Sequence, residues 1–181
     1  MPEFRGRSVV LRPLRPSDAT TLGRYLQDPL VARYLPVRVR REGGMRFVRR
    51  VLREERKGEC VPFAILEARS GEVVGQLRFF HWYRPDRSAE VGYWVGRKHW
   101  GQGFATEALR LACRHGFRAM RLHRINAVVV AQNGASSRVL EKVGFRFEGT
   151  ARASARAGRG WSDERLYGLL AGELRPDRPA R

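Results

Sequence analysis

The segment His99-Trp-Gly-Gln-Gly-Phe-Ala-Thr-Glu-Ala-Leu109 places two glycines and an alanine directly before a run of helix-forming residues. Glycine interrupts regular structure at an entropic cost, so it marks a turn or a point where the backbone approaches another group closely. Three interpretations fit such a segment: a tight turn, a phosphate cradle, or a dinucleotide-binding fingerprint. The surrounding residues decide between them.

Two nucleotide-binding templates do not fit. A P-loop requires Gly-x4-Gly-Lys-Ser/Thr, and the sequence has no Lys-Ser or Lys-Thr pair. A Rossmann fingerprint requires a third glycine and an acidic residue roughly twenty positions on, but Thr106 stands at the glycine position and the strand expected after it ends in Gln132-Asn133. A phosphate cradle and a plain turn both remain, since the first N–H groups of a helix attract anions and the glycines carry no side chains to block one.

The composition is that of a globular protein. With 181 residues and 43% hydrophobic content, we expect one domain over residues 1–174 and a frayed tail over 175–181. The sequence shows no apolar run long enough to cross a bilayer and no signal-peptide stretch, so we expect a cytoplasmic protein with no membrane partner. Cys60 and Cys113 are predicted to be core thiols rather than a disulfide.

The charge is the unusual quantity. Lys and Arg number 36 against 18 Asp and Glu, which gives a formal net charge of +18. Such an excess predicts attraction to polyanions, including nucleic acid, phosphate-rich cofactors and acidic proteins. The basic stretches 33–41 and 152–159 are expected to be loops that would face a ribosome, an RNA or an acidic protein.

Hydrophobic periodicity predicts the element order β-α-α-β-β-β-α-β-α-β-β, an α/β arrangement with a mixed sheet. Ser17 is expected to cap the first helix, and residues 33–41 are expected to be irregular. The predicted strands span residues 8–14, 60–68, 72–82, 88–96, 125–131, 145 onward and 162–170. The predicted helices begin at 17, run from 44 to about 56, from the glycine segment to about 120, and from 135 to 142.

Two motifs resemble the GNAT acetyltransferases. Trp100-Gly-Gln-Gly-Phe-Ala105 is similar to that family's acetyl-CoA pyrophosphate loop, Gln/Arg-x-x-Gly-x-Gly/Ala, although Trp occupies the first position. Val130-Ala-Gln-Asn-Gly-Ala-Ser-Ser-Arg-Val-Leu-Glu-Lys-Val-Gly-Phe145 resembles the later Asn-x-x-Ser and Leu-Glu-Lys-x-Gly-Phe motifs. The likeness covers about residues 8–170 and points to the Rim branch of ribosomal-protein acetyltransferases. It implies a GNAT fold whose sheet splays between the fourth and fifth strands, with the cofactor in that gap.

The resemblance also implies a set of residues for acetyl-CoA, the expected co-substrate. Asn133 would hydrogen-bond the pantetheine arm, and the backbone of Tyr93, Trp94 and Val95 would pair with that arm like an added strand. Arg97 and Lys98 would stand near the phosphates. The pyrophosphate loop would comprise Gly101, Gln102, Gly103, Phe104, Ala105 and Thr106.

Direct transfer of acetyl to an amine requires a base for the ammonium and an acid for the departing thiolate. Glu90 is our candidate base, because alternation places it on the strand face of Gly92 and Trp94; the alternative is a solvent-facing strand residue. Ser136 is the candidate acid by resemblance, and its alternative role is to cap the helix from 135.

Other candidate groups carry less information. The position seven residues after Asn133 is Leu140, which cannot donate a proton, and Tyr167 is a weaker candidate acid than Ser136. No metal site is expected, because the four histidines lack metal-ligand spacing. These histidines are His81, His99, His115 and His123.

The resemblance and the charge together favour the N-terminal α-amine of a ribosomal or other acidic protein as acceptor, and dimers are common in the Rim branch. The pKa of an α-amine is about 8, against about 10.4 for a lysine side chain, so an α-amine needs less help from a base to lose its proton at neutral pH. Two alternatives remain: acetylation of a small amine of the aminoglycoside or polyamine type, and a non-catalytic basic module that binds RNA on the same fold.

Overall fold

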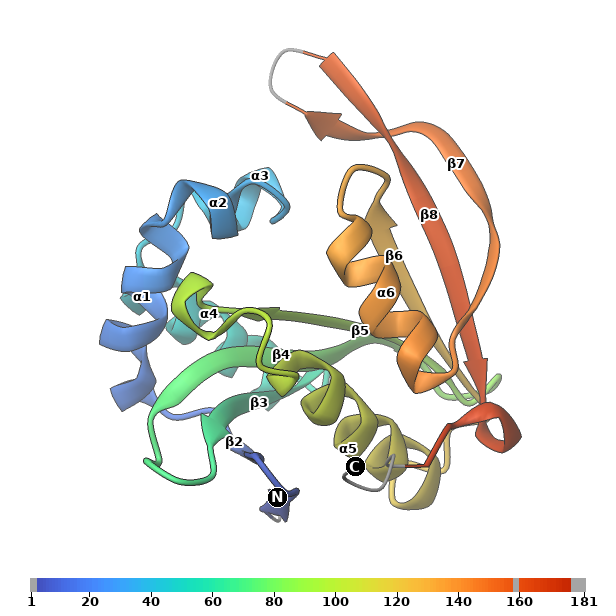
Figure 1. The fold of residues 1–181 in the computed structure, drawn as a ribbon, viewed down its shortest axis with the longest axis horizontal. Coiled ribbons are helices and arrows are strands. Elements are labelled where there is room, and N and C mark those ends of the chain that lie inside the picture. Colours follow the sequence, from blue (N-terminus) through green and yellow to red (C-terminus); the bar gives the residue numbers. More distant parts are fainter. Residues whose placement is uncertain (1–2, 158–159, 177–181) are drawn as a thin grey trace.

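The computed structural model describes residues 3–157 and 160–176. Their strands form one eight-stranded sheet in the order β1-β2-β3-β4-β5-β6-β8-β7 (Figure 1). The strands are β1 (Phe4–Arg5), β2 (Val9–Pro13), β3 (Cys60–Glu67), β4 (Val73–Tyr83), β5 (Ser88–Val95), β6 (Arg124–Val130), β7 (Arg146–Ala157) and β8 (Gly160–Leu170). The α-helices are α1 (Ala19–Gln27), α2 (Pro29–Ala32), α3 (Val37–Arg40), α4 (Gly44–Arg56), α5 (Phe104–Arg118) and α6 (Gly134–Val143).

The sheet splits between β5 and β6. These two strands are parallel and pair only from Ser88 opposite Arg124 to Glu90 opposite Asn126. Beyond Glu90 the strands diverge, and β6 continues in the sheet through β8 alone (Figure 1). Because β1 precedes the strands that the periodicity predicts, β5 and β6 are the predicted fourth and fifth strands. The predicted mixed sheet with a gap at this place is confirmed.

Helices cover both faces of the sheet, and the alternation along β5 separates two cores. Ala89 and Val91 belong to the core that α5 covers, together with Leu109. Trp94 packs in the second core, where α1 and α4 lie, and its ring meets Phe47 at 6.0 Å. Burial of each such side chain contributes about 1.5–3 kcal/mol. The two cores hold both faces of β5 rigid up to the point where the sheet splits.

The start of α1 differs from the prediction that Ser17 caps it. Residues 16–18 form a 3-10 turn, and the Asp18 carboxylate accepts a hydrogen bond from the Arg15 backbone N–H at 2.8 Å. The Arg12 guanidinium donates to the same buried carboxylate at 2.7 Å and 2.9 Å. A bidentate charged pair is stronger than a hydroxyl hydrogen bond, so Asp18 rather than Ser17 organises this helix entry.

Two further regions, residues 29–41 and 152–160, differ from the sequence prediction. The stretch 33–41 is not irregular throughout, because α2 and α3 flank and enter it. The Asp28 carboxylate caps α2 by accepting from the Leu30 N–H at 2.9 Å, and Pro29 supplies the first helical residue. The strands β7 and β8 extend well into 152–160, where a loop was expected. Residues 158–159 and 177–181, the latter in the expected tail, lie outside the described residues.

Cys60 and Cys113 are buried free thiols, as predicted. Burial raises the pKa of the Cys60 thiol to about 11 and also raises that of Cys113. Neither thiol is therefore ionised near neutral pH, which removes the activated form that a nucleophilic cysteine requires. No helix in residues 3–157 and 160–176 is long and apolar enough to cross a membrane.

Candidate active site

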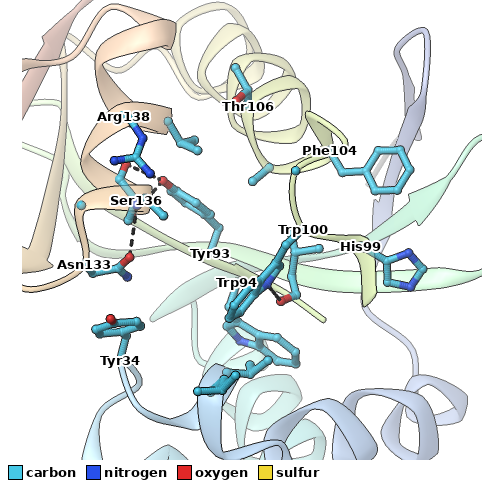
Figure 2. Close-up of a pocket in the computed structure, with 18 of the residues that line it drawn as sticks. Tyr34, Tyr93, Trp94, His99, Trp100, Phe104, Thr106, Asn133, Ser136 and Arg138 are labelled. Atoms are coloured by element: carbon cyan, nitrogen blue, oxygen red, sulfur yellow. Dashed lines mark hydrogen bonds between the residues drawn. The ribbon is translucent and has the colours of Figure 1, made fainter. Parts of the chain in front are cut away.

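A cavity of about 520 Å³ opens at the split in the sheet, between the α2–α3 segment, the end of β5 and the first turns of α5 and α6 (Figure 2). Most of the residues that the sequence assigns to the cofactor line it. They are Tyr93, Trp94, Val95, Gly101, Gly103, Phe104, Ala105, Thr106, Asn133 and Ser136. Residues more than forty positions apart in the sequence therefore meet in one space.

The glycine loop has the shape of an anion cradle. Gly101 and Gly103 adopt φ values of +76° and +82°, a left-handed conformation that L side chains rarely adopt, and nothing lies within 4 Å of a Cβ built on either. Helix α5, with 15 residues, begins directly after Gly103. Its unpaired first-turn N–H groups and its dipole favour a negative charge in this space. The loop thus has room for a pyrophosphate; Gly58 and Gly71 have the same open, left-handed geometry in ordinary turns, so it is the position of Gly101 and Gly103 at the start of α5 and in the cavity lining that favours a cradle.

Gln102 and Trp100 contribute to the loop's own structure. The Gln102 side chain donates to the Lys98 carbonyl at 3.1 Å, and this residue does not line the cavity. The Trp100 indole N–H donates to the Val95 carbonyl at 2.8 Å. Trp100 therefore ties the loop to the end of β5, which explains how an aromatic residue serves at the first position of the motif.

The cations of the cavity are not the ones that the sequence predicted. Lys98 forms an ion pair with Glu72, and neither Lys98 nor Arg97 lines the cavity. Arg138 and Lys142 of α6 line it instead. Their spacing of four residues, counted from Gly134, places all three on one helix face, and this is the signal that would have identified them.

Two hydroxyl groups meet on one side of the cavity. The Tyr93 hydroxyl lies 3.0 Å from the Ser136 Oγ (Figure 2). Burial raises the pKa of Tyr93, so its phenol remains protonated at neutral pH. Sequence reasoning assigned Tyr93 only a backbone role, because contact with Ser136 depends on how α6 packs against β5.

Asn133, not Ser136, caps α6. The Asn133 Oδ1 accepts a hydrogen bond from the Ser136 backbone N–H at 3.2 Å. This leaves the Ser136 hydroxyl with Tyr93 rather than in a capping role. A contact between Asn133 and a pantetheine arm would therefore use its side-chain amide N–H groups.

A second cavity, of about 690 Å³, adjoins the first and shares Tyr34, Tyr93, Trp94 and Ser136 with it. Glu90 lines this second cavity, on the strand face of Gly92 and Trp94 that the sequence predicted. Its side chain is 24% exposed, and the Oε2 atom lies 3.2 Å from the Nδ1 atom of His81. Tyr167, in contrast, is 2% exposed, donates to Glu141 at 3.4 Å and lines neither cavity.

The second cavity is positively charged. Among the described residues, four arginines line it against two glutamates. These are Arg33, Arg40, Arg78 and Arg156 against Glu90 and Glu164. Arg78 is paired with Glu54, so a group that enters this cavity meets the other three arginines against two glutamates, which is still an excess of guanidinium groups.

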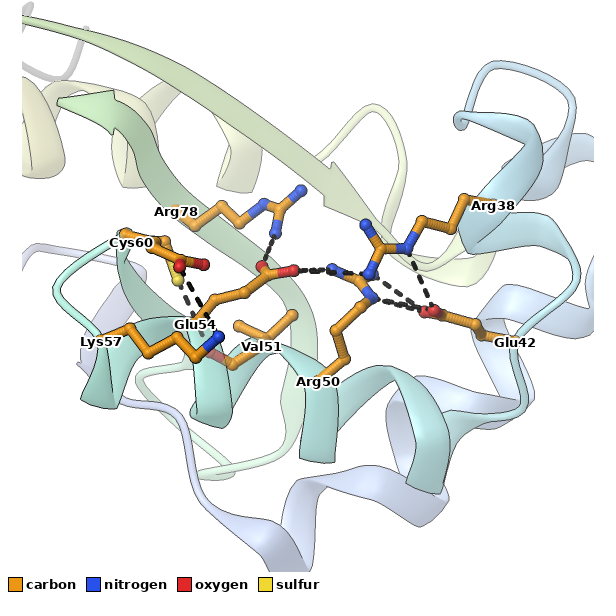
Figure 3. A network of polar contacts seen from close by, with 9 residues as sticks. Arg38, Glu42, Arg50, Val51, Glu54, Lys57, Cys60 and Arg78 are labelled. Atoms are coloured by element: carbon orange, nitrogen blue, oxygen red, sulfur yellow. Dashed lines mark hydrogen bonds and ion pairs between the residues drawn. The ribbon is translucent and has the colours of Figure 1, made fainter.

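An ion-pair network holds the floor of the second cavity (Figure 3). Arg50 of α4 is 8% exposed and bonds Glu42 at 2.8 Å and Glu54 at 2.9 Å. Glu54 also bonds Arg78 of β4 at 3.0 Å. Breaking a buried pair from one side leaves an uncompensated charge, so this network fixes α4 and the end of α3 against β4.

Comparison with known proteins agrees with this geometry. Residues 8–146 match the model of the acetyltransferase (GNAT) domain. The chain belongs to the GNAT family. The "Probable N-acetyltransferase YjcK" of Bacillus subtilis is 31% identical to this chain over 92% of this chain and 96% of its own length.

Rim-type GNAT proteins are also among its relatives. Mycobacterium smegmatis RimJ, solved in complex with CoA-disulfide, superimposes with a TM-score of 0.82 at 33% identity, over 92% of this chain and 83% of that one. The "[Ribosomal protein uS5]-alanine N-acetyltransferase" of Escherichia coli is 29% identical over 68% of this chain and 64% of its own length. The GNAT chain is thus an acetyl-CoA-dependent N-acetyltransferase, and the interpretation as a non-catalytic RNA-binding module is set aside.

Proposed function

We propose that this enzyme acetylates the N-terminal α-amine of an acidic protein, with a ribosomal protein as the leading class. The observation that supports the proposal is the excess of arginine in the second cavity, which adjoins the cofactor cavity. A polyamine or an aminoglycoside is a polycation, and the guanidinium groups that line the second cavity would repel it. An acidic peptide would be attracted, and the formal net charge of +18 would steer it towards the enzyme.

The first cavity, which most of the residues expected to bind the cofactor line, would hold acetyl-CoA in position for the reaction. The N–H groups that follow Gly103 at the start of α5 would hold the pyrophosphate, and Arg138 and Lys142 would neutralise phosphate charge. Acetyl-CoA, when bound, supplies the thioester whose acetyl carbon the amine attacks. The edge of β5 beyond Glu90, where pairing with β6 ends, would hold the pantetheine arm.

Glu90 is the proposed general base. Its carboxylate lines the cavity in which the acceptor would bind, and because the two cavities share lining residues, that space would adjoin the acyl end of acetyl-CoA bound in the first cavity. A carboxylate there accepts the proton that the ammonium must lose before nitrogen can attack carbon. The C–N bond then forms as the C–S bond breaks.

Tyr93 is the proposed general acid, with Ser136 as its hydrogen-bond partner. A phenol that keeps its proton can donate it to the leaving sulfur. We expect Tyr93→Phe to lower kcat by about a hundredfold or more, with little change in the Kd of acetyl-CoA. Stopped-flow or steady-state measurement of thiol release checks this.

The pair Tyr93→Phe and Ser136→Ala forms a double-mutant cycle. If the two hydroxyls act as one unit, the double variant loses no more rate than Tyr93→Phe alone. Additive losses would show that they act separately, and an unchanged kcat in Tyr93→Phe would eliminate Tyr93 as the acid.

The acceptor class is tested with purified enzyme, acetyl-CoA and matched acceptors. We expect peptides with a free N-terminus and acidic residues in the first positions to have a kcat/KM at least tenfold above that of spermidine, because attraction replaces repulsion in the second cavity. The advantage should shrink as the salt concentration rises. A higher kcat/KM for spermidine or for an aminoglycoside would overturn the proposal in favour of a small-amine acetyltransferase.

A further inference from the structure

His81 occupies an unusual backbone conformation beside the proposed base. Its φ is +49°, a left-handed conformation that is uncommon for residues other than glycine, although His is enriched there together with Asn and Asp. The position lies in a bulge: Phe80 is opposite Glu90 and Tyr83 is opposite Ser88, so two residues of β4 face one residue of β5. A bulge of this kind commonly has glycine at its left-handed position.

The bulge points the imidazole at Glu90. The His81 Nδ1 lies 3.2 Å from the Glu90 Oε2, and the imidazole ring packs edge-on against Phe80 at 4.8 Å. In an unbroken strand His81 would point to the face opposite Phe80 and Glu90, because neighbouring side chains alternate. Backbone strain of this kind persists where the surrounding structure imposes it, and it gathers at functional sites.

The two side chains differ in exposure. Glu90 is 24% exposed and faces the second cavity, whereas His81 is 78% exposed. The nearest charged group on the same face of β4 is Arg78, which bonds Glu54. Across the split, Asn126 of β6 stands opposite Glu90 and accepts a hydrogen bond from Arg124. Among the described residues, His81 is therefore the one basic, solvent-exposed side chain at hydrogen-bond distance that could accept a proton from Glu90.

We propose that His81 is a proton relay that returns Glu90 to its ionised form after each turnover. The ammonium proton of the acceptor passes to the Glu90 carboxylate. The resulting carboxylic acid passes that proton to Nδ1 of neutral His81, and the imidazolium releases a proton to solvent. Both groups then have their starting charges. His81 lines neither cavity and acts through Glu90, and the inference rests on the proposed role of Glu90 as base.

Two substitutions separate a relay from a structural contact. His81→Gly relieves the left-handed conformation, so its Tm is expected to rise while kcat falls about tenfold at neutral pH. His81→Asn tolerates the positive φ and can still donate to Glu90, but it cannot carry a proton, so its kcat should fall equally. His123→Asn removes another exposed histidine and should leave kcat unchanged.

Chemical rescue is the decisive readout. Imidazole added to His81→Gly should restore kcat in proportion to the concentration of its free-base form, while wild type stays unaffected. If His81→Asn retains full kcat, or if imidazole does not restore the rate, the relay is overturned and His81 only positions Glu90. If Glu90→Gln also leaves kcat unchanged, Glu90 is not the base. If Glu90→Gln lowers kcat and His81→Gly does not, Glu90 remains the base and only the relay is overturned.

Discussion

Replacement of Glu90 with Gln is expected to lower kcat/KM for a peptide acceptor by roughly 10²- to 10⁴-fold at neutral pH, the usual contribution of a positioned base. Glutamine preserves the size of the side chain and its hydrogen bonding but cannot take the ammonium proton. Because Glu90 lines the second cavity and not the first, the Kd of acetyl-CoA should stay the same. Initial rates of thiol release, with calorimetry for the Kd, measure both quantities.

The pH dependence of that loss gives a second check. An α-amine has a pKa of about 8, so a growing share of acceptor is already neutral as the pH rises towards 9. The deficit of Glu90→Gln should therefore shrink with rising pH. Glu164→Gln is the matched control, since Glu164 also lines the second cavity and carries the same charge. Equal losses in the two variants would show that charge in the cavity, and not proton transfer, is what Glu90 provides.

The order of the elements was predictable from sequence because each long element carries its own signal. The strands from β2 to β8 alternate or run apolar, and α4 and α5 repeat their apolar residues at helical spacing. β1 was not predicted, since two residues are too few for a pattern and its pairing of Phe4 with Leu11 depends on the rest of the sheet. The start of α2 had a readable signal in Asp28-Pro29, a capping residue followed by proline.

The lining of the first cavity was predictable where its residues belong to local sequence motifs. The open, left-handed glycines at 101 and 103 and the Asn133 to Ser136 segment lie where the motifs place them. Proximity in sequence favoured Arg97 and Lys98, which do not line this cavity, whereas the fold brings Arg138 of α6 across the split to line it. Motif spacing reports on one segment at a time, and contacts between segments depend on tertiary packing.

The remaining site features depend on register and therefore lay beyond sequence reasoning. The Tyr93 hydroxyl meets Ser136 only because α6 packs beside the end of β5. His81 reaches Glu90 only because β4 has one residue more than β5 between two pairs of partners. A bulge near the end of a strand has no compositional signal unless glycine marks it, and in β4 histidine holds that position.

We propose that the loop from Gly101 to Ala105 holds the pyrophosphate of acetyl-CoA at the start of α5. Gly103→Trp places an indole in the open cradle, so we expect its affinity for acetyl-CoA to fall by roughly a hundredfold or more. Each hydrogen bond to a charged phosphate oxygen contributes about 1.5–3 kcal/mol, and two such bonds account for a loss of that size.

Gly58→Trp provides the matched control for strain. Gly58 has a φ of +72° and also has nothing within 4 Å of a Cβ built on it, but it lies at the end of α4 and lines neither cavity. Both substitutions place a tryptophan at a left-handed position, at a cost of about 1–2 kcal/mol in stability. A difference in acetyl-CoA affinity between them therefore reports on the cradle and not on folding.

Calorimetric titration of acetyl-CoA into wild type, Gly103→Trp and Gly58→Trp, with NADH as a second ligand, tests this claim most directly. The predicted result is micromolar binding of acetyl-CoA to wild type and to Gly58→Trp, its loss in Gly103→Trp, and no comparable binding of NADH. Equal affinity of all three proteins for acetyl-CoA would contradict the claim, because the glycines would then form a turn that the cofactor does not use.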